Sequence, residues 1–316
     1  MTINNKLKIF SANANFTLGE EIAEYLGISI GRSRIGAFKD GEISLEIDES
    51  VRGCDVFIVQ PTCYPVNDNI MQLLIMIDAM KRASAQRITA VMPYYGYARQ
   101  ERKSKARDPI SAKLMANLLT AAGANRVIAM DLHANAIQGF FDIPLDHLPG
   151  VPLLAEYYKA REEADLMVVS PDLGGVTRAR DLANRLGVNI AIIDKIRPAK
   201  NQAEIMSVIG NIKGKTVIMV DDIIDTAGTI TKGAEALLNM GAKKVYACCT
   251  HPVFSPPALE RLESSPIREI LTTNTIPIDH ERQGQCSKIK VLSVAALLGE
   301  AIIRIHENLS VSKLFD

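Results

Sequence analysis

Short apolar runs alternate with amphipathic segments along almost the whole chain, and this alternation constrains the fold more than any other feature. The apolar runs predict strands at residues 7–11, 56–60, 88–92, 127–131, 167–170, 190–193, 216–220, 245–249 and 269–271. The segments between them predict helices at residues 69–82, 111–122, 176–186 and 228–240. Strands that alternate with helices indicate an α/β fold, with a mainly parallel sheet flanked by helices. Ligands of such folds bind beyond the carboxyl ends of the strands.

The length of the chain and one proline-containing segment together predict two domains. The 316 residues are enough for two domains of roughly 150 residues each. The segment HLPGVP at 147–152 places two prolines and a glycine between strand–helix units. Because strand and helix content is similar on both sides, we expect two similar halves with a boundary near residue 149.

The composition excludes several classes of protein. Lys and Arg total 36, as do Asp and Glu, so the formal net charge is zero and broad nucleic-acid binding is not expected. The five cysteines form no C-x-x-C pair, so neither a disulfide framework nor a zinc site is indicated. No signal-peptide core and no apolar run of membrane-spanning length is found. We expect a cytoplasmic protein that binds neither a membrane nor nucleic acid.

The stretch VIMVDDIIDT at 217–226 runs from an apolar strand directly into acidic residues. Asp221, Asp222 and Asp225 place three carboxylates within five residues, where they repel one another. Burying such a cluster is costly unless it has partners. A fold keeps these residues at a strand end when they bind hydroxyl groups, a divalent cation, or both.

The turn after these carboxylates predicts a phosphate site. It reads Thr226, Ala227, Gly228, Thr229, and a helix begins near residue 230. Backbone N–H groups at a helix N-terminus attract anions, and the two threonine hydroxyls can add hydrogen bonds. The carboxylates would then face a polyhydroxylated group such as ribose. The alternative is a capped helix with a solvated acidic turn.

Two other predicted strands also end in polar residues. MDLHAN at 130–135 places His133 at a strand end, where it can bind a metal or donate to a phosphate. A structural, hydrogen-bonded histidine is the alternative. In VVSPDLGGVTRAR at 168–180, Asp172 precedes two glycines that open a helix, so it is either a site residue or a plain helix cap.

Two segments of the N-terminal half are further candidates. AFKDGEISLEI at 37–47 places Asp40 and Gly41 in a predicted β-turn, and a plain hairpin is the simpler interpretation. YYGYARQ at 94–100 follows a strand and ends in Arg99, which can bind a phosphate or stack on a base. For the tyrosines, buried aromatic packing is the alternative.

Lys195 and Arg197 follow the strand that ends near Asp194. Two cations on a polar loop suit a lid that closes over a phosphoryl-transfer site, where negative charge builds up on the transferred group. The alternative is a solvated surface loop.

Taken together, these stretches resemble the ribose-phosphate pyrophosphokinases, also called phosphoribosyl pyrophosphate synthetases, through essentially the whole chain. The matching motifs are FKDGE (38–42), ESVRG (49–53), YARQ (97–100), ARDPISAKL (106–114), DLHAN (131–135), SPDLGGVTRAR (170–180), DKIRP (194–198), VDDIIDTAGT (220–229) and SVSKLF (310–315). The motif VDDIIDTAGT alone is shared with phosphoribosyltransferases, whereas its combination with the others is specific to this family.

The resemblance implies an enzyme that converts ATP and ribose 5-phosphate to 5-phosphoribosyl 1-pyrophosphate and AMP with Mg²⁺. It implies two phosphoribosyltransferase-like domains, at 1–149 (the ATP side) and 150–306 (the ribose 5-phosphate side), with 307–316 returning to the first. By the same resemblance, the catalytic residues are Lys195, Arg197 and His133. The ATP site would comprise Phe38, Asp40, Gly41, Glu42, Arg99, Gln100 and His133. The ribose 5-phosphate site would comprise Arg197, Asp221, Asp222, Asp225, Thr226, Ala227, Gly228 and Thr229.

For the metal, the resemblance implies that His133 and Asp172 hold it with its waters, with Asp221 and Asp222 beside it. It further implies a homohexamer that is controlled by phosphate and ADP. The residues implied for that control are Ser50, Arg52, Arg107, Ser310 and Ser312.

One position departs from the pattern of the family. The catalytic loop of bacterial members commonly reads K-R-R-P, whereas residue 196 is isoleucine here. A non-catalytic regulatory paralogue is therefore one alternative, although such a protein would be expected to lack Lys195, Arg197 or His133. An ordinary phosphoribosyltransferase is another alternative, but it usually needs a single domain of this kind.

Overall fold

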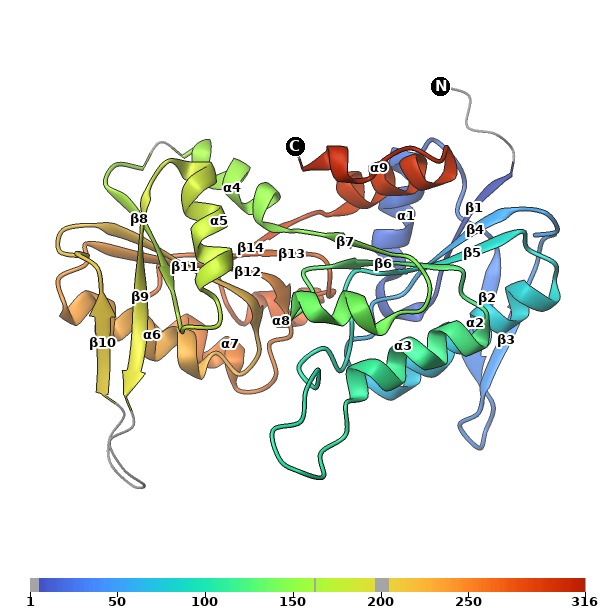
Figure 1. Cartoon of the computed structure of the whole chain (residues 1–316), viewed down its shortest axis with the longest axis horizontal. Coiled ribbons are helices and arrows are strands. Elements are labelled where there is room, and N and C mark those ends of the chain that lie inside the picture. The colour runs from blue at the N-terminus through green and yellow to red at the C-terminus, as the bar shows by residue number, and fades with distance from the viewer. Residues whose placement is uncertain (1–5, 162, 197–204, 316) are drawn as a thin grey trace. The chain divides into compact units, whose positions relative to one another are not determined.

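The computed structural model describes residues 6–161, 163–196 and 205–315, with only the backbone described at 195, 196, 205 and 206. These residues form two compact units (Figure 1). The first comprises the described residues up to Leu148, the segment Thr275–Pro277 and the residues from Ser293 onward. The second comprises Pro149–Asn274 and Ile278–Leu292 within the described ranges.

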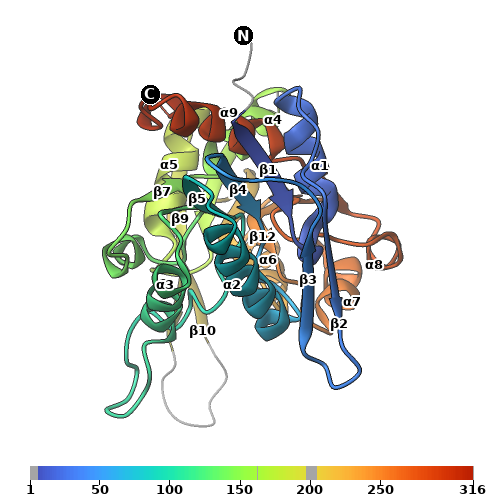
Figure 2. The same cartoon turned by 90° about the vertical axis from the view of Figure 1, so that its right-hand side faces the viewer.

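The first unit contains a five-stranded parallel sheet. In sheet order its strands are β1 (Leu7–Ser11), β4 (Asp55–Val59), β5 (Arg87–Met92), β6 (Arg126–Met130) and β7 (Leu145–Leu148). Its helices are α1 (Phe16–Tyr25), α2 (Val66–Arg82), α3 (Ser111–Ala122) and α9 (Ala295–His306), with short 3-10 turns η1 (Asn13–Asn15), η2 (Asn135–Phe140) and η3 (Ser312–Leu314). Helices α2 and α3 pack together, and α2 contacts β4 and β5 (Figure 2). Helix α1 packs against α9 and β1. Every residue of β4 is buried, as expected for a strand of a sheet covered on both faces.

A two-stranded antiparallel hairpin accompanies this sheet. It is formed by β2 (Ser33–Ala37) and β3 (Ile43–Ile47). Its positions are exposed or half-buried, and the side chains of Ile35, Leu45 and Ile47 pack against the core of the first unit. The tip of the hairpin projects from the unit (Figure 2).

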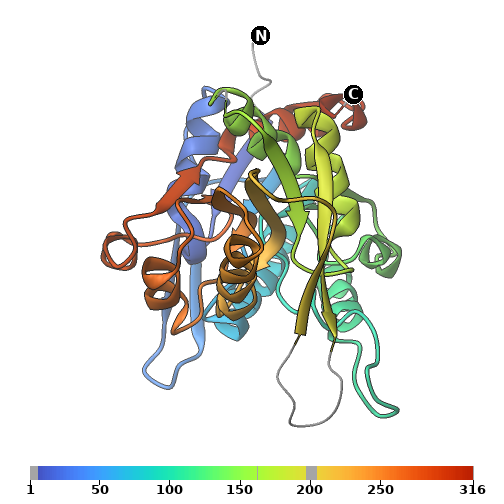
Figure 3. The same ribbon diagram turned by 90° about the vertical axis from the view of Figure 1, so that its left-hand side faces the viewer.

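The second unit contains a seven-stranded sheet (Figure 3). In sheet order its strands are β10 (Ile205–Ile209), β9 (Asn189–Ile196), β8 (Leu166–Ser170), β11 (Thr216–Ile224), β12 (Lys244–Pro252), β13 (Ile270–Thr273) and β14 (Ile289–Leu292). Its helices are α4 (Val151–Lys159), α5 (Val176–Leu186), α6 (Gly228–Asn239), α7 (Ala258–Ser264) and α8 (His280–Gly284). All neighbouring strands are parallel except the edge strand β10, which is antiparallel to β9.

Strand β11 shows why the central strands read as continuous apolar runs. Val217 and Met219 belong to one core cluster with residues of α6 and α7. Ile218 and Val220 belong to a second cluster with residues of α4 and α5 on the opposite face of the sheet. Because both faces are covered, every position of the strand up to Val220 must be apolar or small.

The predicted fold class is confirmed, and all nine predicted strands occur with ends shifted by a few residues. Strand β11 is longer than predicted: it continues to Ile224 because β12 pairs with it up to Pro252. Asp221 and Asp222 therefore lie inside the last part of the strand rather than beyond its end. Among the described residues, no helix is long and apolar enough to span a membrane.

The domain limits predicted from the sequence, 1–149 and 150–306 with 307–316 returning, stay a prediction. In the structure the residues from Ser293 onward, including all of α9, pack within the first unit. The ring of Tyr25 in α1 packs directly against Gly299 in α9, and a Cβ added to Gly299 would collide with this ring.

A cluster of ionisable side chains, Asp55, Arg87 and His306, also links α9 to the sheet of the first unit. Asp55 in β4 accepts hydrogen bonds from Nε (2.8 Å) and Nη2 of Arg87, and its Oδ2 lies 2.8 Å from Nδ1 of His306. Arg87 Nη2 also donates to the carbonyl of Ile305 (2.9 Å). The Asp55 side chain is only 9% exposed, so its charge depends on these partners.

We expect Asp55→Asn to lower the free energy of unfolding by about 2 kcal/mol, because it leaves the half-buried Arg87 without its anionic partner. The urea midpoint of unfolding measures this effect. Asp78→Asn is the matched control, since it removes an exposed carboxylate paired with Arg82 on α2 and should leave the midpoint unchanged. Equal midpoints for both variants would contradict a stabilising role of the cluster.

Candidate active site

The sheet of the second unit has a topological switch point at the carboxyl ends of β8 and β11. From β8 the chain continues outward to β9 and β10, and from β11 it continues in the opposite direction to β12, β13 and β14. The loops that follow β8 and β11 therefore diverge, and this is where open α/β sheets bind ligands. The two loops carry Asp172 and the DTAGT turn.

Asp221 and Asp222 lie at this switch point and share one arginine. Arg178 Nη1 lies 3.4 Å from Oδ1 of Asp221 and 3.2 Å from Oδ1 of Asp222. The backbone N–H of Asp222 donates to Oδ1 of Asp221 (2.9 Å). Asp222 is buried and Asp221 half-buried, so a single cation partly neutralises two desolvated carboxylates.

This crowding changes the acidity of the pair. Burial, together with the neighbouring Asp222, raises the pKa of Asp221 to about 8, although Arg178 opposes the shift. Asp172 adds a further repulsive charge. The pair is therefore short of positive charge, which suits a divalent cation and hydroxyl donors.

The donor set fits Mg²⁺ better than a metal held by protein ligands alone. Among the described residues, no group of three or more His, Cys, Asp or Glu side chains is placed to hold a metal ion. Mg²⁺ is usually bound by one or two carboxylates and keeps several waters or substrate phosphates. Asp172, Asp221 and Asp222 offer hard oxygen ligands of that kind.

The raised pKa of Asp221 predicts that the metal-free protein loses stability as the pH rises. Asp221 has an ordinary pKa of 3.8, but it keeps its proton up to about pH 8 in the folded protein. The folded state therefore binds more protons than the unfolded state in this window, and the free energy of unfolding falls with increasing pH. Urea unfolding at several pH values should show a flatter pH dependence for Asp221→Asn than for the unaltered protein. Identical slopes would contradict the raised pKa.

Asp172 both caps a helix and lies at the candidate site. Its Oδ1 accepts the N–H of Gly175 at the start of α5 (3.0 Å), and Ser170 Oγ donates to its carbonyl (2.6 Å). A Cβ at Gly175 would lie 2.9 Å from Ser170 Oγ, which explains the second glycine of the motif. The side chain of Asp172 is exposed, so the cap alternative and a ligand role are compatible.

The turn after β11 opens helix α6. Ala227 is the N-cap residue and takes a left-handed conformation, with φ of +60°. Thr231 Oγ1, one turn into the helix, donates to the carbonyl of Ala227 (2.9 Å). Thr226 and Thr229 are exposed, and Asp225 is half-buried. The turn thus presents hydroxyls and the N-terminal N–H groups of a twelve-residue helix, the arrangement that binds phosphate.

The FKDGE segment forms the tip of the hairpin in the first unit. Phe38 N–H donates to the carbonyl of Glu42 (2.7 Å), and Asp40 Oδ1 accepts the N–H of Glu42 (3.1 Å). Gly41 has φ of +94°, a conformation that favours glycine. The structure therefore contains the plain hairpin that the simpler interpretation predicts. Phe38 lies at the tip of this hairpin and is 60% exposed. Binding of ATP by these residues stays a prediction.

The loop after β5 divides the YYGYARQ segment into buried and exposed parts. Tyr95 is buried: its ring packs edge to face on Phe141 with centroids 5.7 Å apart, and its hydroxyl donates to the carbonyl of Ala112 (2.8 Å). Arg99 and Gln100 are exposed, and Gln100 Oε1 accepts from Ser111 Oγ (2.6 Å). The aromatic-packing alternative thus holds for Tyr95, while the polar end of the segment faces solvent.

The loop after β6 carries His133 as an exposed side chain. Asp131, two residues earlier, has φ of +36°, and its N–H donates to the carbonyl of Leu148. The N–H of Leu132 donates to Nε2 of His147 in β7 (3.0 Å). His147 thereby fixes the backbone next to His133.

The remaining predicted residues fall into two groups. Lys195 lies in β9, where its backbone is paired opposite Met206. The side chains of Lys195 and Ile196 are outside the described part of the structure, and so is the whole of Arg197. The five residues assigned to control by phosphate and ADP are all exposed and all in the first unit: Ser50, Arg52, Arg107, Ser310 and Ser312. Ser310 Oγ and Ser312 Oγ lie 2.7 Å apart.

Sequence reasoning did not find three residues that support these loops. Arg178 lies in the first turn of α5, where a cation opposes the helix dipole, and that unfavourable placement was a usable signal. His147 carries no local signal, and it begins the segment at 147–152 that is interpreted as a domain boundary, whereas it lies in β7. Arg261 in α7 donates from Nη1 to the carbonyl of Thr226 (3.0 Å), and no local pattern marks it.

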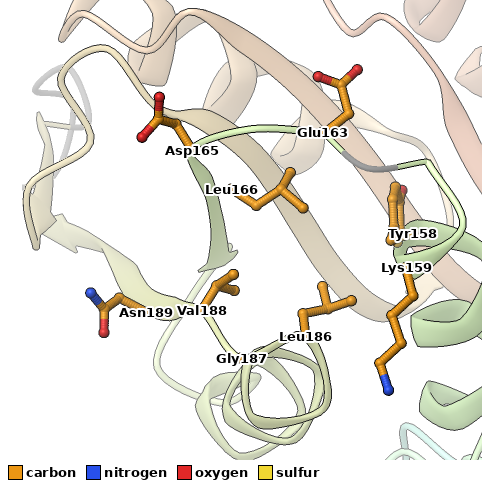
Figure 4. Close-up of a pocket in the computed structure, with 9 residues that line it drawn as sticks. All are labelled: Tyr158, Lys159, Glu163, Asp165, Leu166, Leu186, Gly187, Val188 and Asn189. Carbon is orange, nitrogen blue, oxygen red and sulfur yellow. The ribbon is translucent and has the colours of Figure 1, made fainter.

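A separate hollow of about 490 Å³ lies at the amino ends of β8 and β9 (Figure 4). Its lining residues are Tyr158, Lys159, Glu163, Asp165, Leu166, Leu186, Gly187, Val188 and Asn189. Leu166 begins β8, whereas the carboxylate pair and the phosphate-type turn lie at the opposite, carboxyl edge of the same sheet. The hollow is therefore distinct from the candidate site.

Comparison with known proteins identifies the family. The N-terminal domain of ribose phosphate pyrophosphokinase matches residues 7–123, and the phosphoribosyl synthetase-associated domain matches residues 197–316. A ribose-phosphate pyrophosphokinase of Oceanobacillus iheyensis is 60% identical over 313 residues, which cover 99% of this chain and 98% of that protein. A ribose-phosphate pyrophosphokinase of Caldanaerobacter subterraneus is 61% identical over 312 residues, which cover 98% of each chain.

A solved structure agrees with these matches. The phosphoribosylpyrophosphate synthetase of Mycobacterium smegmatis has 43% sequence identity and a TM-score of 0.91, and the match covers 96% of this chain and 100% of that chain. The family predicted from the sequence motifs is thereby confirmed over nearly the whole length. The chain belongs to the ribose-phosphate pyrophosphokinase family.

Proposed function

We propose that this chain catalyses the reaction ATP + ribose 5-phosphate → 5-phosphoribosyl 1-pyrophosphate + AMP, with the residues of the two units in the following roles. The anomeric hydroxyl of the sugar attacks the β-phosphorus of ATP, and the diphosphoryl group moves as one unit while AMP leaves. The observation that carries the proposal is the carboxylate pair Asp221–Asp222, followed within a few residues by a phosphate-type turn at the switch point.

The ribose 5-phosphate site is assigned to the second unit. The turn at 225–229 binds the 5-phosphate through backbone N–H groups and the hydroxyls of Thr226 and Thr229. Asp221 and Asp222 accept hydrogen bonds from the ribose hydroxyls. Arg178 holds this pair in place through its contacts of 3.4 and 3.2 Å.

The ATP site is assigned to exposed residues of the first unit. Phe38 offers an exposed aromatic face for the adenine base, and Arg99 offers a guanidinium group for the phosphates. The other residues assigned to this site are Asp40, Gly41, Glu42, Gln100 and His133.

Lys195 and Arg197 are assigned to the transition state. Negative charge builds up on the transferred diphosphoryl group, and cations that meet it only at that stage lower the barrier. Bound Mg²⁺ would neutralise phosphate charge and orient the leaving group. His133 and Asp172 are the residues proposed to hold it through its waters, together with the carboxylate pair.

Assembly and control are part of the proposal. By the resemblance to the family, the chain forms a homohexamer that responds to phosphate and ADP. The residues assigned to these effectors are Ser50, Arg52, Arg107, Ser310 and Ser312. The adjacent hydroxyls of Ser310 and Ser312 support an anion site, because both can donate hydrogen bonds to the same phosphate group.

ATP labelled at the β-phosphorus tests the type of transfer. A diphosphokinase moves the label to the sugar product and leaves unlabelled AMP, whereas a simple kinase leaves it in ADP. The expected product is labelled 5-phosphoribosyl 1-pyrophosphate. Label that remains in ADP would refute diphosphoryl transfer.

A further inference from the structure

Arg261 contacts the phosphate-type turn from a neighbouring helix. Its Nη1 donates to the carbonyl of Thr226 (3.0 Å). The same nitrogen lies 3.4 Å from the position that a Cβ on Gly228 would occupy. One guanidinium group therefore contacts Thr226 and lies close to Gly228, two of the residues assigned to the 5-phosphate, although Arg261 belongs to α7 and not to the motif.

The turn needs such support because its backbone is strained. Ala227, between the two contacted residues, has φ of +60°, a conformation that costs a residue with a side chain about 1 kcal/mol or more. Strain of this kind persists only where the surroundings hold it. Thr231 holds the turn from within α6 through the carbonyl of Ala227, and Arg261 holds it from outside α6.

The position of Arg261 is itself fixed. Ala258 and Leu262 of α7 are fully buried in the core of the second unit. Lys288 Nζ donates to the carbonyls of Leu262 (3.1 Å) and Ser265 (2.7 Å) at the C-terminal end of the helix. The guanidinium group thus extends from an anchored helix, which lowers the entropy cost of holding it at the turn.

We propose that Arg261 is a positioning residue for the 5-phosphate of the substrate. It fixes the peptide group between Thr226 and Ala227, whose N–H belongs to the phosphate-binding turn, and its bond to the carbonyl polarises that N–H. Its positive charge also lies close to a turn that receives a dianion. The inference rests on the proposed ribose 5-phosphate site, and it adds a residue outside the motifs by which that site was found.

Steady-state kinetics of Arg261 variants test the proposal. Arg261→Ala should raise the KM for ribose 5-phosphate about five- to tenfold, while kcat at saturating sugar and the KM for ATP stay within about twofold. Arg261→Lys keeps the charge and should recover part of the affinity at low ionic strength but not at high ionic strength. Arg261→Gln keeps a hydrogen-bond donor without the charge and should show the smaller dependence on salt.

Arg268→Gln is the matched control, since it removes an exposed arginine at the amino end of β13, away from the turn. It should leave the KM for ribose 5-phosphate unchanged. An unchanged KM in Arg261→Ala, or a loss of kcat without a change in KM, would overturn the role of Arg261. If Arg261→Ala does not fold, the KM for ribose 5-phosphate of Arg261→Lys and Arg261→Gln provides the test, and an unchanged KM in both would overturn the role of Arg261.

The variant Asp225→Ala separates this inference from the proposed function. If it weakens ribose 5-phosphate binding while the Arg261 variants do not, only the role of Arg261 is wrong. If neither Asp225→Ala nor the Arg261 variants affect that binding, the turn is not the phosphate site and both proposals fail.

Discussion

Lys195→Ala is expected to lower kcat by about a thousandfold while leaving the binding of ribose 5-phosphate nearly intact. The reason is electrostatic: a cation that meets the diphosphoryl group only during transfer stabilises the transition state and not the bound substrates. Lys195 lies in β9, the strand next to the antiparallel edge strand β10, and is therefore near one edge of the sheet. The turn assigned to the sugar phosphate follows the central strand β11 instead.

Two measurements are needed for this prediction. Single-turnover formation of AMP reports the chemical step, and isothermal titration with ribose 5-phosphate reports binding. Lys213→Ala is the matched control, because it removes an exposed lysine of the same unit outside the motifs. Near-normal turnover in Lys195→Ala would show that the role of Lys195 has been assigned wrongly.

Asp225→Ala is expected to raise the KM for ribose 5-phosphate by at least about tenfold, with a smaller effect on kcat. Asp225 is the first residue after β11, and its half-buried carboxylate leads into the strained turn at Ala227. Without that side chain, the backbone N–H groups lose the arrangement in which they receive the phosphate.

Asp181→Ala provides the comparison for Asp225→Ala. Asp181 lies on α5 and is paired with Arg185 one turn later, so its loss removes a carboxylate of the same unit without touching the turn. The KM for ribose 5-phosphate should be unaffected by this change. An unchanged KM in Asp225→Ala would remove the turn from the substrate site.

Much of the second unit was predictable because its central strands are buried on both faces. The apolar run at 217–220 has no polar position up to Val220, and the acidic residues that break this pattern mark the end of the sheet. The direction of a parallel sheet then places the site residues at its carboxyl edge. The pattern did not give the length of β11, because its extension to Ile224 depends on pairing with β12, which is a non-local contact.

Other features were not predictable from local sequence. The strands β7 and β14 mix apolar with charged residues, as LDHL and IKVL, so they lack the continuous uncharged run that marks a buried strand of the same length such as β13. The packing of α9 in the first unit depends on Asp55, Arg87 and Tyr25, which are more than 200 residues away along the chain. Similarly, Ala227 takes a left-handed conformation where glycine would be expected, because Thr231 and Arg261 hold the turn.

The two arginines that support the site could not be predicted from local sequence either. Arg178 balances the carboxylate pair from α5, and Arg261 holds the phosphate-type turn from α7. Neither contact follows from the spacing of residues in a motif, because each joins separate elements of the sheet and its helices. The motifs identify the groups that meet the substrate, whereas the residues that position those groups become visible only in the folded unit.

The most direct test of the proposed activity is the release of AMP from ATP with Mg²⁺ and phosphate, measured with and without ribose 5-phosphate. The products are resolved by chromatography, so that AMP, ADP and 5-phosphoribosyl 1-pyrophosphate are quantified separately. We predict AMP formation that depends on the sugar, together with an equal amount of 5-phosphoribosyl 1-pyrophosphate. Binding of both substrates without AMP formation would contradict the proposed activity and would indicate a regulatory member of the family.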